Sequence, residues 1–187
     1  MLDDSNNIAP FLWLGWVARK YPHIIKEIDS LGHEIGSHSN AHQLIHRYDR
    51  NFFKKDLEIS INSLEDITGK KVISYRAPGF SLIPETLWVF DELLKQGIEI
   101  DCSIFLGNHS HGGRIKEFGT GPSIINIDGN IQNGKGIKNR LRDLMIYWIL
   151  GSDKAEIFFE DGRLDELTNE WKKATGLKTN IPEVVIK

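Results

Sequence analysis

Two histidines four residues apart are the sharpest candidates for chemistry in this sequence. His38 and His42 lie in the segment Gly32–His42, which reads Gly-His-Glu-Ile-Gly-Ser-His-Ser-Asn-Ala-His. On a helical turn this spacing places both imidazoles on one face, where two nitrogens can bind one cation. Imidazoles suit Zn, Co, Ni or Fe, and a third, carboxylate ligand with an open position would make the site catalytic. The alternative is a pair that caps a loop or lies on a wet surface, and spacing alone leaves both open.

A second candidate is the segment Tyr75–Ser81, which reads Tyr-Arg-Ala-Pro-Gly-Phe-Ser. Arg76, at the end of an expected strand, can orient a carboxylate through paired hydrogen bonds. The Pro78-Gly79 pair predicts a turn whose backbone N–H groups can face a ligand. The alternative is an ordinary turn between strand and helix, with the arginine bonded to backbone carbonyls.

The elements that must position these residues alternate between extended and helical segments. The sequence predicts helices at about 16–31, 50–68 and 84–96, each followed by a glycine. It predicts strands at Ile8–Leu14, His33–Ser37, Lys71–Tyr75 and Ile98–Cys102. Alternation at intervals of about 30 residues is typical of parallel βαβ units, which predicts an α/β layer or barrel. In such folds the chemistry lies at the C-terminal ends of the strands, where both candidate segments are placed.

The pattern changes after about residue 108, where a glycine-rich stretch with weak periodicity begins. A helix is expected at about 137–150 and short strands at Ala155–Phe159 and Ile181–Ile186. We therefore divide the chain into a domain at 1–125 and a divergent segment at 126–187 that packs on it.

Composition excludes several classes of protein. The 187 residues include 23 Lys+Arg and 26 Asp+Glu, so the net charge of −3 provides no basic field for nucleic acid or anionic lipid. The single cysteine, Cys102, excludes an intramolecular disulfide framework. The longest apolar run, Leu144–Leu150, is far short of the ~20 residues of a spanning helix. The acidic start does not resemble a secretory signal, so the chain as given is expected in the cytoplasm; a natural start further upstream would leave its compartment unknown.

Taken together, these motifs resemble the polysaccharide deacetylase family, carbohydrate esterase family 4. The resemblance rests on Phe11–Ala18, Gly32–His38, His42 and Arg76–Pro78, continues more weakly through Asp101–Phe105, and spans about Ile8 to Ile125. The Leu14–Ala18 run and His111-Gly112-Gly113 are similar to bacterial members linked to exopolysaccharide synthesis. The resemblance implies an incomplete or distorted (β/α) barrel at 1–125 and an N-acetylated glycan as substrate.

The resemblance also implies roles for the candidate residues. His38 and His42 match the family's two metal-binding histidines, with Zn expected and Co, Ni or Fe as alternatives. Arg76 matches the arginine that orients the catalytic aspartate, and Gly79 lies where a backbone N–H stabilises the oxyanion. We expect Pro78 and Phe80 to contact substrate. In the family, a metal ion and an aspartate activate water for attack on the acetamide, and a late histidine protonates the leaving amine.

Two parts of the family's pattern have no counterpart at the expected places. The acidic pair should end a strand that precedes Ile8 by a strand and a helix; Asp3 and Asp4 are the candidates to replace it. No histidine follows His111, so His109 and His111 are the candidates to replace the late histidine.

The absent first strand is expected to leave a central hydrogen-bonding edge of the sheet unpaired. We expect Ala155–Phe159, Ile181–Ile186, a second copy of the chain or a partner protein to cover that edge.

Two functions remain at this point. One is metal-dependent hydrolysis of N-acetyl groups on a polysaccharide or oligosaccharide. The other is a non-catalytic relative that binds carbohydrate or a polysaccharide-synthesis partner through the same groove.

Overall fold

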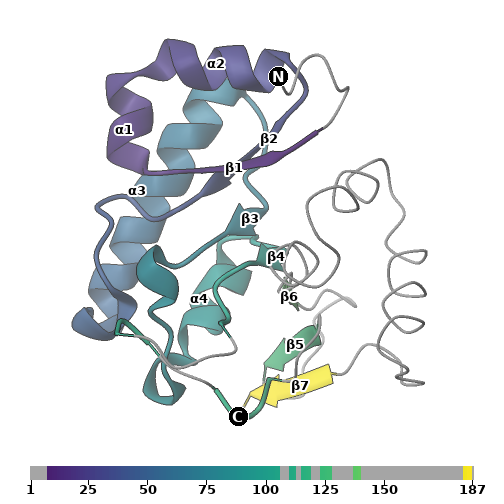
Figure 1. Cartoon of the computed structure of the whole chain (residues 1–187). Coiled ribbons are helices and arrows are strands. Elements are labelled where there is room, and N and C mark those ends of the chain that lie inside the picture. The colour runs from purple at the N-terminus through teal and green to yellow at the C-terminus, as the bar shows by residue number, and fades with distance from the viewer. Residues whose placement is uncertain are drawn as a thin grey trace.

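The computed structural model describes residues 8–105, 110–112, 115–118, 123–127, 137–139 and 183–186. Within these residues, seven strands form one sheet in the order β1-β2-β3-β4-β6-β5-β7 (Figure 1). The parallel strands are β1 (Pro10–Trp13), β2 (Glu34–Ser37), β3 (Ser74–Tyr75), β4 (Ile100–Asp101) and β6 (Ile137–Asn139). β5 (Ser123–Ile127) runs antiparallel to β6, and β7 (Glu183–Ile186) runs parallel to β5. The expected α/β fold with a parallel sheet is confirmed.

The helices follow the predicted order; α3 has the predicted bounds of 50–68, whereas the first and third predicted helices differ in theirs. They are α1 (Gly15–Lys20), α2 (Pro22–Ser30), α3 (Arg50–Thr68) and α4 (Val89–Lys95), with 3-10 turns at Ile45–Arg47, Pro78–Phe80 and Pro84–Thr86. The single helix expected at 16–31 is two helices. Pro22 lacks the N–H that would continue α1, so a new helix begins there with proline in its first turn.

Helix α3 is the element that organises this half of the molecule. Its first residue follows Asp49, whose side chain accepts a hydrogen bond from Phe52 N at 2.8 Å, and its last turn is closed by Gly69 in the left-handed conformation (φ 69°). Figure 1 shows α3 running alongside the strands, and it packs against α1, α2 and β2. Its buried apolar residues join the core: Phe53, Leu57, Ile61 and Leu64.

Three expectations for the rest of the chain are corrected or lie outside the described residues. Residues 137–139 form β6 rather than the start of a helix, because pairing with β4 and β5 overrides the local helical pattern. Residues 140–150 and 155–159 lie outside the described residues. The proposed boundary at 125/126 falls inside β5, and the described parts of 126–187 are strands of the same sheet; the division into segments stays a prediction.

One of the segments expected to cover an open strand edge, Ile181–Ile186, lies elsewhere in the sheet. β1 lies at one end of the sheet and pairs with β2 alone among the described strands. β7 pairs with β5 at the other end, so residues 183–186 do not cover β1. A partner or second copy at the β1 edge stays a prediction.

In the described part of the chain, every helix is too short or too polar to cross a lipid bilayer.

Candidate active site

The loop after β2 and the turn after β3 meet at one edge of the sheet. Their backbones are tied by a hydrogen bond from Arg76 N to Ser37 O (3.0 Å). The turn is also tied to the segment after β4 through a side chain, since Ala77 N donates to Ser103 Oγ at 2.8 Å. The C-terminal ends of three parallel strands therefore converge, as expected of an α/β site.

His38 and His42 lie side by side at this edge. Their ring centroids are 5.1 Å apart, with the rings inclined at 66°. His38 Nδ1 lies 2.8 Å from the carbonyl oxygen of Arg76. Because a carbonyl can only accept, Nδ1 carries the proton and Nε2 keeps its lone pair for a metal ion. Burial lowers the pKa of His38, outweighing the contribution of that hydrogen bond, and so favours the neutral form that coordinates metals.

A loop brings the two rings together, and not the helical turn that the four-residue spacing predicts. Residues 38–44 are not helical, and both Ser39 (φ 71°) and His42 (φ 56°) have left-handed backbones. His42 N donates to Ser39 Oγ at 3.0 Å, which closes the loop on itself. A tight loop thus produces the proximity that a helix would give through its period.

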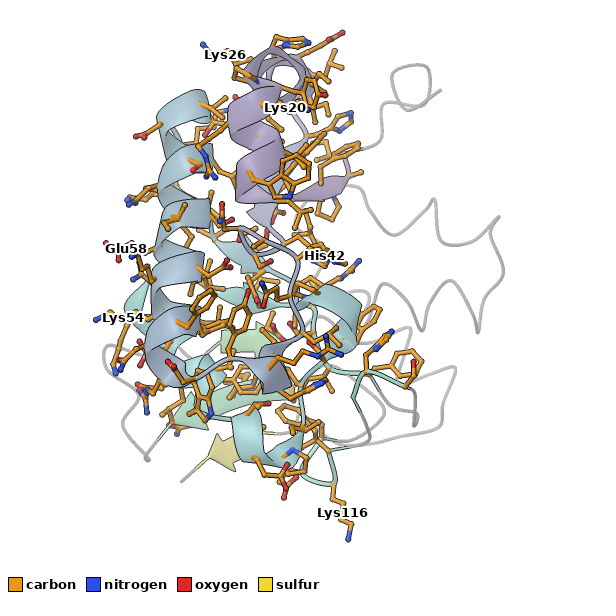
Figure 2. All side chains as sticks on the ribbon, turned by 90° about the vertical axis from the view of Figure 1, so that its left-hand side faces the viewer. Lys20, Lys26, His42, Lys54, Glu58 and Lys116 are labelled. Atoms are coloured by element: carbon orange, nitrogen blue, oxygen red, sulfur yellow. The ribbon has the colours of Figure 1, made fainter. Side chains whose placement is uncertain are left out.

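Helices α1 and α3 hold this loop from outside. Asn40 N donates to the Asp56 carboxylate at 2.8 Å, and Ser60 Oγ donates to Ser39 O at 3.0 Å. Gly15 N, at the start of α1, donates to the same Ser39 carbonyl at 3.0 Å. Figure 2 shows the loop with His42 beside α3.

Asp56 and Ser60 were not predicted from the sequence to be site residues. They are one helical turn apart and both buried, next to the apolar stripe that begins at Phe53. Two polar residues at helical spacing beside a buried stripe were the only available signal, and it does not say what they contact.

The Arg76 side chain has ring contacts, but part of its hydrogen-bonding capacity is unused among the described residues. The guanidinium carbon lies 5.5 Å from the centroid of the Phe80 ring, and that ring lies 5.5 Å from the ring of Phe105. The Nε atom of Arg76 is buried and has no hydrogen-bond partner among the described residues. It is therefore available to a carboxylate or ligand oxygen.

Gly79 lies at the centre of this turn, with φ 61°. A methyl group added to it would lie 3.4 Å from Cβ and Cδ2 of His111, so the structure brings His111 against the turn. Pro78 is buried, so its predicted contact with substrate would be through the backbone or after a rearrangement. His109, Asp3 and Asp4 lie outside the described residues.

A buried carboxyl group, Asp101, lies behind the turn at the end of β4. It is fully buried, and it accepts hydrogen bonds from Ser103 Oγ (2.5 Å) and Ser103 N (2.9 Å). Burial raises its pKa to about 6, although Ser103 and the charge of Arg76 oppose the shift. Because it is shielded from solvent, Asp101 can act on the site only through its neighbours.

The donor set fits part of a metal centre. Two adjacent imidazoles, one with its tautomer fixed, suit Zn or a similar divalent ion. Among the described residues no group of three or more His, Cys, Asp or Glu side chains could hold a metal ion. Two protein ligands are therefore assigned as candidates, and any third ligand lies outside the described residues.

Comparisons with known proteins identify the family of this chain. The polysaccharide deacetylase family matches residues 1–97, just over half of the chain. The search of curated proteins gave no match.

Among solved structures, a protein from Mycobacterium smegmatis assigned as a polysaccharide deacetylase matches with a TM-score of 0.60 and 19% identity, covering 98% of this chain and 59% of its own. A family 4 carbohydrate esterase from Streptomyces lividans, in complex with acetate, matches with a TM-score of 0.49 and 16% identity, covering 54% and 50%. A polysaccharide deacetylase from Bacillus cereus matches with a TM-score of 0.48 and 21% identity, covering 55% and 50%.

The chain thus spans between half and three-fifths of the length of these three structures. The likeness to the Mycobacterium protein shows the fold alone, an α/β fold with a parallel sheet. With the family match over residues 1–97, the chain belongs to the polysaccharide deacetylase family, a family of carbohydrate deacetylases that hydrolyse carbon–nitrogen bonds.

Proposed function

We propose that this protein hydrolyses N-acetyl groups on a polysaccharide or oligosaccharide with the help of a divalent metal ion, with Zn expected. The observation that carries the proposal is the His38–His42 pair, whose ring centroids are 5.1 Å apart at the C-terminal edge of the sheet. A divalent ion bound there would polarise the acetamide carbonyl and lower the pKa of water. An exopolysaccharide is the substrate suggested by the resemblance of the His111-Gly112-Gly113 segment.

The chain's own residues would divide the remaining tasks. Arg76 has a buried Nε that can orient the carboxylate acting as base; Asp3 and Asp4 are the candidates for that carboxylate within this sequence. The Gly79 N–H would donate to the oxygen that gains negative charge as the amide carbonyl is attacked. Phe80 and Phe105, both partly exposed, would pack against the sugar ring.

His111 is our candidate for the proton donor to the leaving amine. Its side chain packs against Gly79, the residue expected to stabilise the oxyanion. An imidazole at this position would protonate the nitrogen as the C–N bond breaks, so that acetate and a free amino sugar are released.

The test is acetate release from N-acetylglucosamine oligomers with added Zn²⁺ or Co²⁺. We expect His38→Ala to abolish both acetate release and zinc binding, because the loop would lose one of its two imidazoles. His46→Ala is the matched control, since His46 is exposed on the neighbouring 3-10 turn. Absence of acetate from the natural full-length protein, or full activity in His38→Ala, would contradict the proposal.

A second candidate function is carbohydrate binding without catalysis. It is favoured by the Phe80–Phe105 pair, a partly exposed aromatic surface next to the Arg76 guanidinium. Calorimetric binding of the same oligomers, lost in Phe80→Ala, together with no acetate release in the presence of metal, would select this function over hydrolysis.

A further inference from the structure

Asp56 is a buried carboxylate directed at the backbone between the two candidate metal ligands. Its side chain belongs to α3, and the residue is 5% exposed. Its Oδ2 accepts a hydrogen bond from Asn40 N at 2.8 Å, and the N–H of Ala41 donates to the same carboxylate. Burial raises the pKa of Asp56 while these two N–H groups oppose the shift, so the loop is part of what stabilises the buried charge.

The conformation of this loop needs external support. Ser39 and His42 both have positive φ values, 71° and 56°, which residues with a Cβ rarely adopt. A loop with two such residues in four holds one conformation only when its surroundings fix it.

Asp56 differs from the other groups that hold the loop. The carbonyl of Ser39 is bound by Ser60 Oγ and Gly15 N, whereas the amides of Asn40 and Ala41 are bound by Asp56. Hydrogen bonds to an ionised carboxylate are shorter and stronger than neutral ones. Loss of this acceptor would leave two neighbouring N–H groups without their partner in the middle of the loop.

We propose that Asp56 is a positioning residue: its carboxylate fixes the loop so that the imidazoles of His38 and His42 converge on one divalent cation. The nature of the ligand rests on the proposed function; the positioning of the loop does not. Asp56 touches neither the metal nor the substrate in this arrangement, and it acts through the backbone of Asn40 and Ala41.

The experiment compares Asp56→Asn with Glu58→Gln. Glu58 is exposed on the same helix and, in Figure 2, points away from the His42 loop, so its variant removes the same charge without touching the loop. Amide hydrogen exchange of the metal-free protein reports the loop, and competition with a chromophoric chelator reports zinc affinity.

We expect Asp56→Asn to speed amide exchange at Asn40 and Ala41 about tenfold and to weaken zinc binding about 10- to 100-fold, as substitutions of groups behind metal ligands typically do. Protection within α3 should persist. Asp56→Glu, which keeps the charge, should recover part of the zinc affinity, and Glu58→Gln should change neither quantity.

Two results would overturn the proposal. One is rapid amide exchange at Asn40 and Ala41 in the wild type. The other is an unchanged zinc affinity in an Asp56→Asn variant that folds, even if its stability is lowered. Should Asp56→Asn fail to fold, wild-type exchange and the zinc affinity of Asp56→Glu decide the matter. A wild type that binds neither zinc nor cobalt would refute the proposed function, and loop exchange would then decide the positioning role by itself.

Discussion

The candidate site has a histidine half, the loop after β2 with His38 and His42, and an arginine half, the end of β3 and the turn with Arg76. The two halves differ in how many of their buried polar groups are hydrogen-bonded. The loop after β2 has partners for its backbone on both sides: Asp56 and Ser60 of α3, and the start of α1. The end of β3 contrasts with it. There the buried Oγ of Ser74, the hydroxyl of Tyr75 and Nε of Arg76 have no hydrogen-bond partner among the described residues.

This difference indicates what each half depends on. Buried polar groups in folded proteins are nearly always hydrogen-bonded, so a cluster without partners marks a place where another group belongs. The histidine half is positioned by α1 and α3, which are both described. In the arginine half, the buried Nε of Arg76 has no partner among the described residues, and a carboxylate is the acceptor that a guanidinium binds best.

Apart from the loss of activity expected for His38→Ala, the largest expected effect comes from removing the Arg76 side chain. We expect Arg76→Ala to lower kcat/KM for acetate release by about 100- to 1,000-fold, because the carboxylate that acts as base would no longer be oriented. This is the size of effect seen when one preorganised hydrogen-bond donor is removed from an active site. Zinc affinity should stay within about twofold of the wild type, because His38 is bound by the main-chain carbonyl of residue 76, which alanine retains. Steady-state kinetics and chelator competition measure the two quantities.

Arg47→Ala is the control for this variant, since Arg47 is exposed on the 3-10 turn nearby. If Arg76→Ala loses zinc affinity as much as activity, the two halves are not separate.

The next effect concerns Asp101, the buried carboxyl of the arginine half. Its pKa is about 6 in the folded chain because of burial, against 3.8 for an exposed group. The folded state therefore binds the proton more tightly, so the free energy of unfolding falls as the pH rises from about 4 to above 6. The full change is about 3 kcal/mol.

Asn cannot titrate, so Asp101→Asn should gain stability relative to the wild type over that pH range. Urea unfolding at pH 4, 5, 6 and 7 measures the gap between the two proteins, with exposed Asp66→Asn as the matched control. Parallel pH curves for wild type and Asp101→Asn would contradict the prediction.

Local signals predicted the elements whose limits are fixed by local chemistry. The bounds of α3 follow from its Asp49 cap, its apolar stripe and Gly69, and all three are visible in the sequence. Pro22 was also visible, but its effect on the preceding helix was missed. The strand β6 was not predictable in this way, because its conformation is stabilised by pairing with β4 and β5.

In the candidate site, too, features with a local sequence signal were predicted and features that depend on distant segments were not. The sequence predicted that the His38–His42 pair and the Arg-Ala-Pro turn follow neighbouring strands, and the structure brings the two segments together at one edge of the sheet. Asp56 and the approach of His111 to Gly79 could not be predicted, since both depend on how distant segments pack. The left-handed backbone of the histidine loop, at Ser39 and His42, has no local signal such as glycine.

The smallest expected effect tests how tightly the histidine half is packed. A Cβ on Gly15 would lie 2.8 Å from Ser60 Cα and 3.0 Å from Asn40 Oδ1. Helix propensity alone predicts that Gly15→Ala stabilises α1 by up to about 1 kcal/mol. We expect the opposite sign, a loss of about 1–2 kcal/mol, because the methyl group must push α1 away from the α3 backbone.

Urea unfolding measures the change, with exposed Lys20→Ala in the same helix as the control. Faster amide exchange at Asn40 should accompany the loss, because the displaced groups include those that hold the loop. A stabilised Gly15→Ala protein would mean that the contact between α1 and α3 is loose, and the histidine half would then be no better positioned than the arginine half.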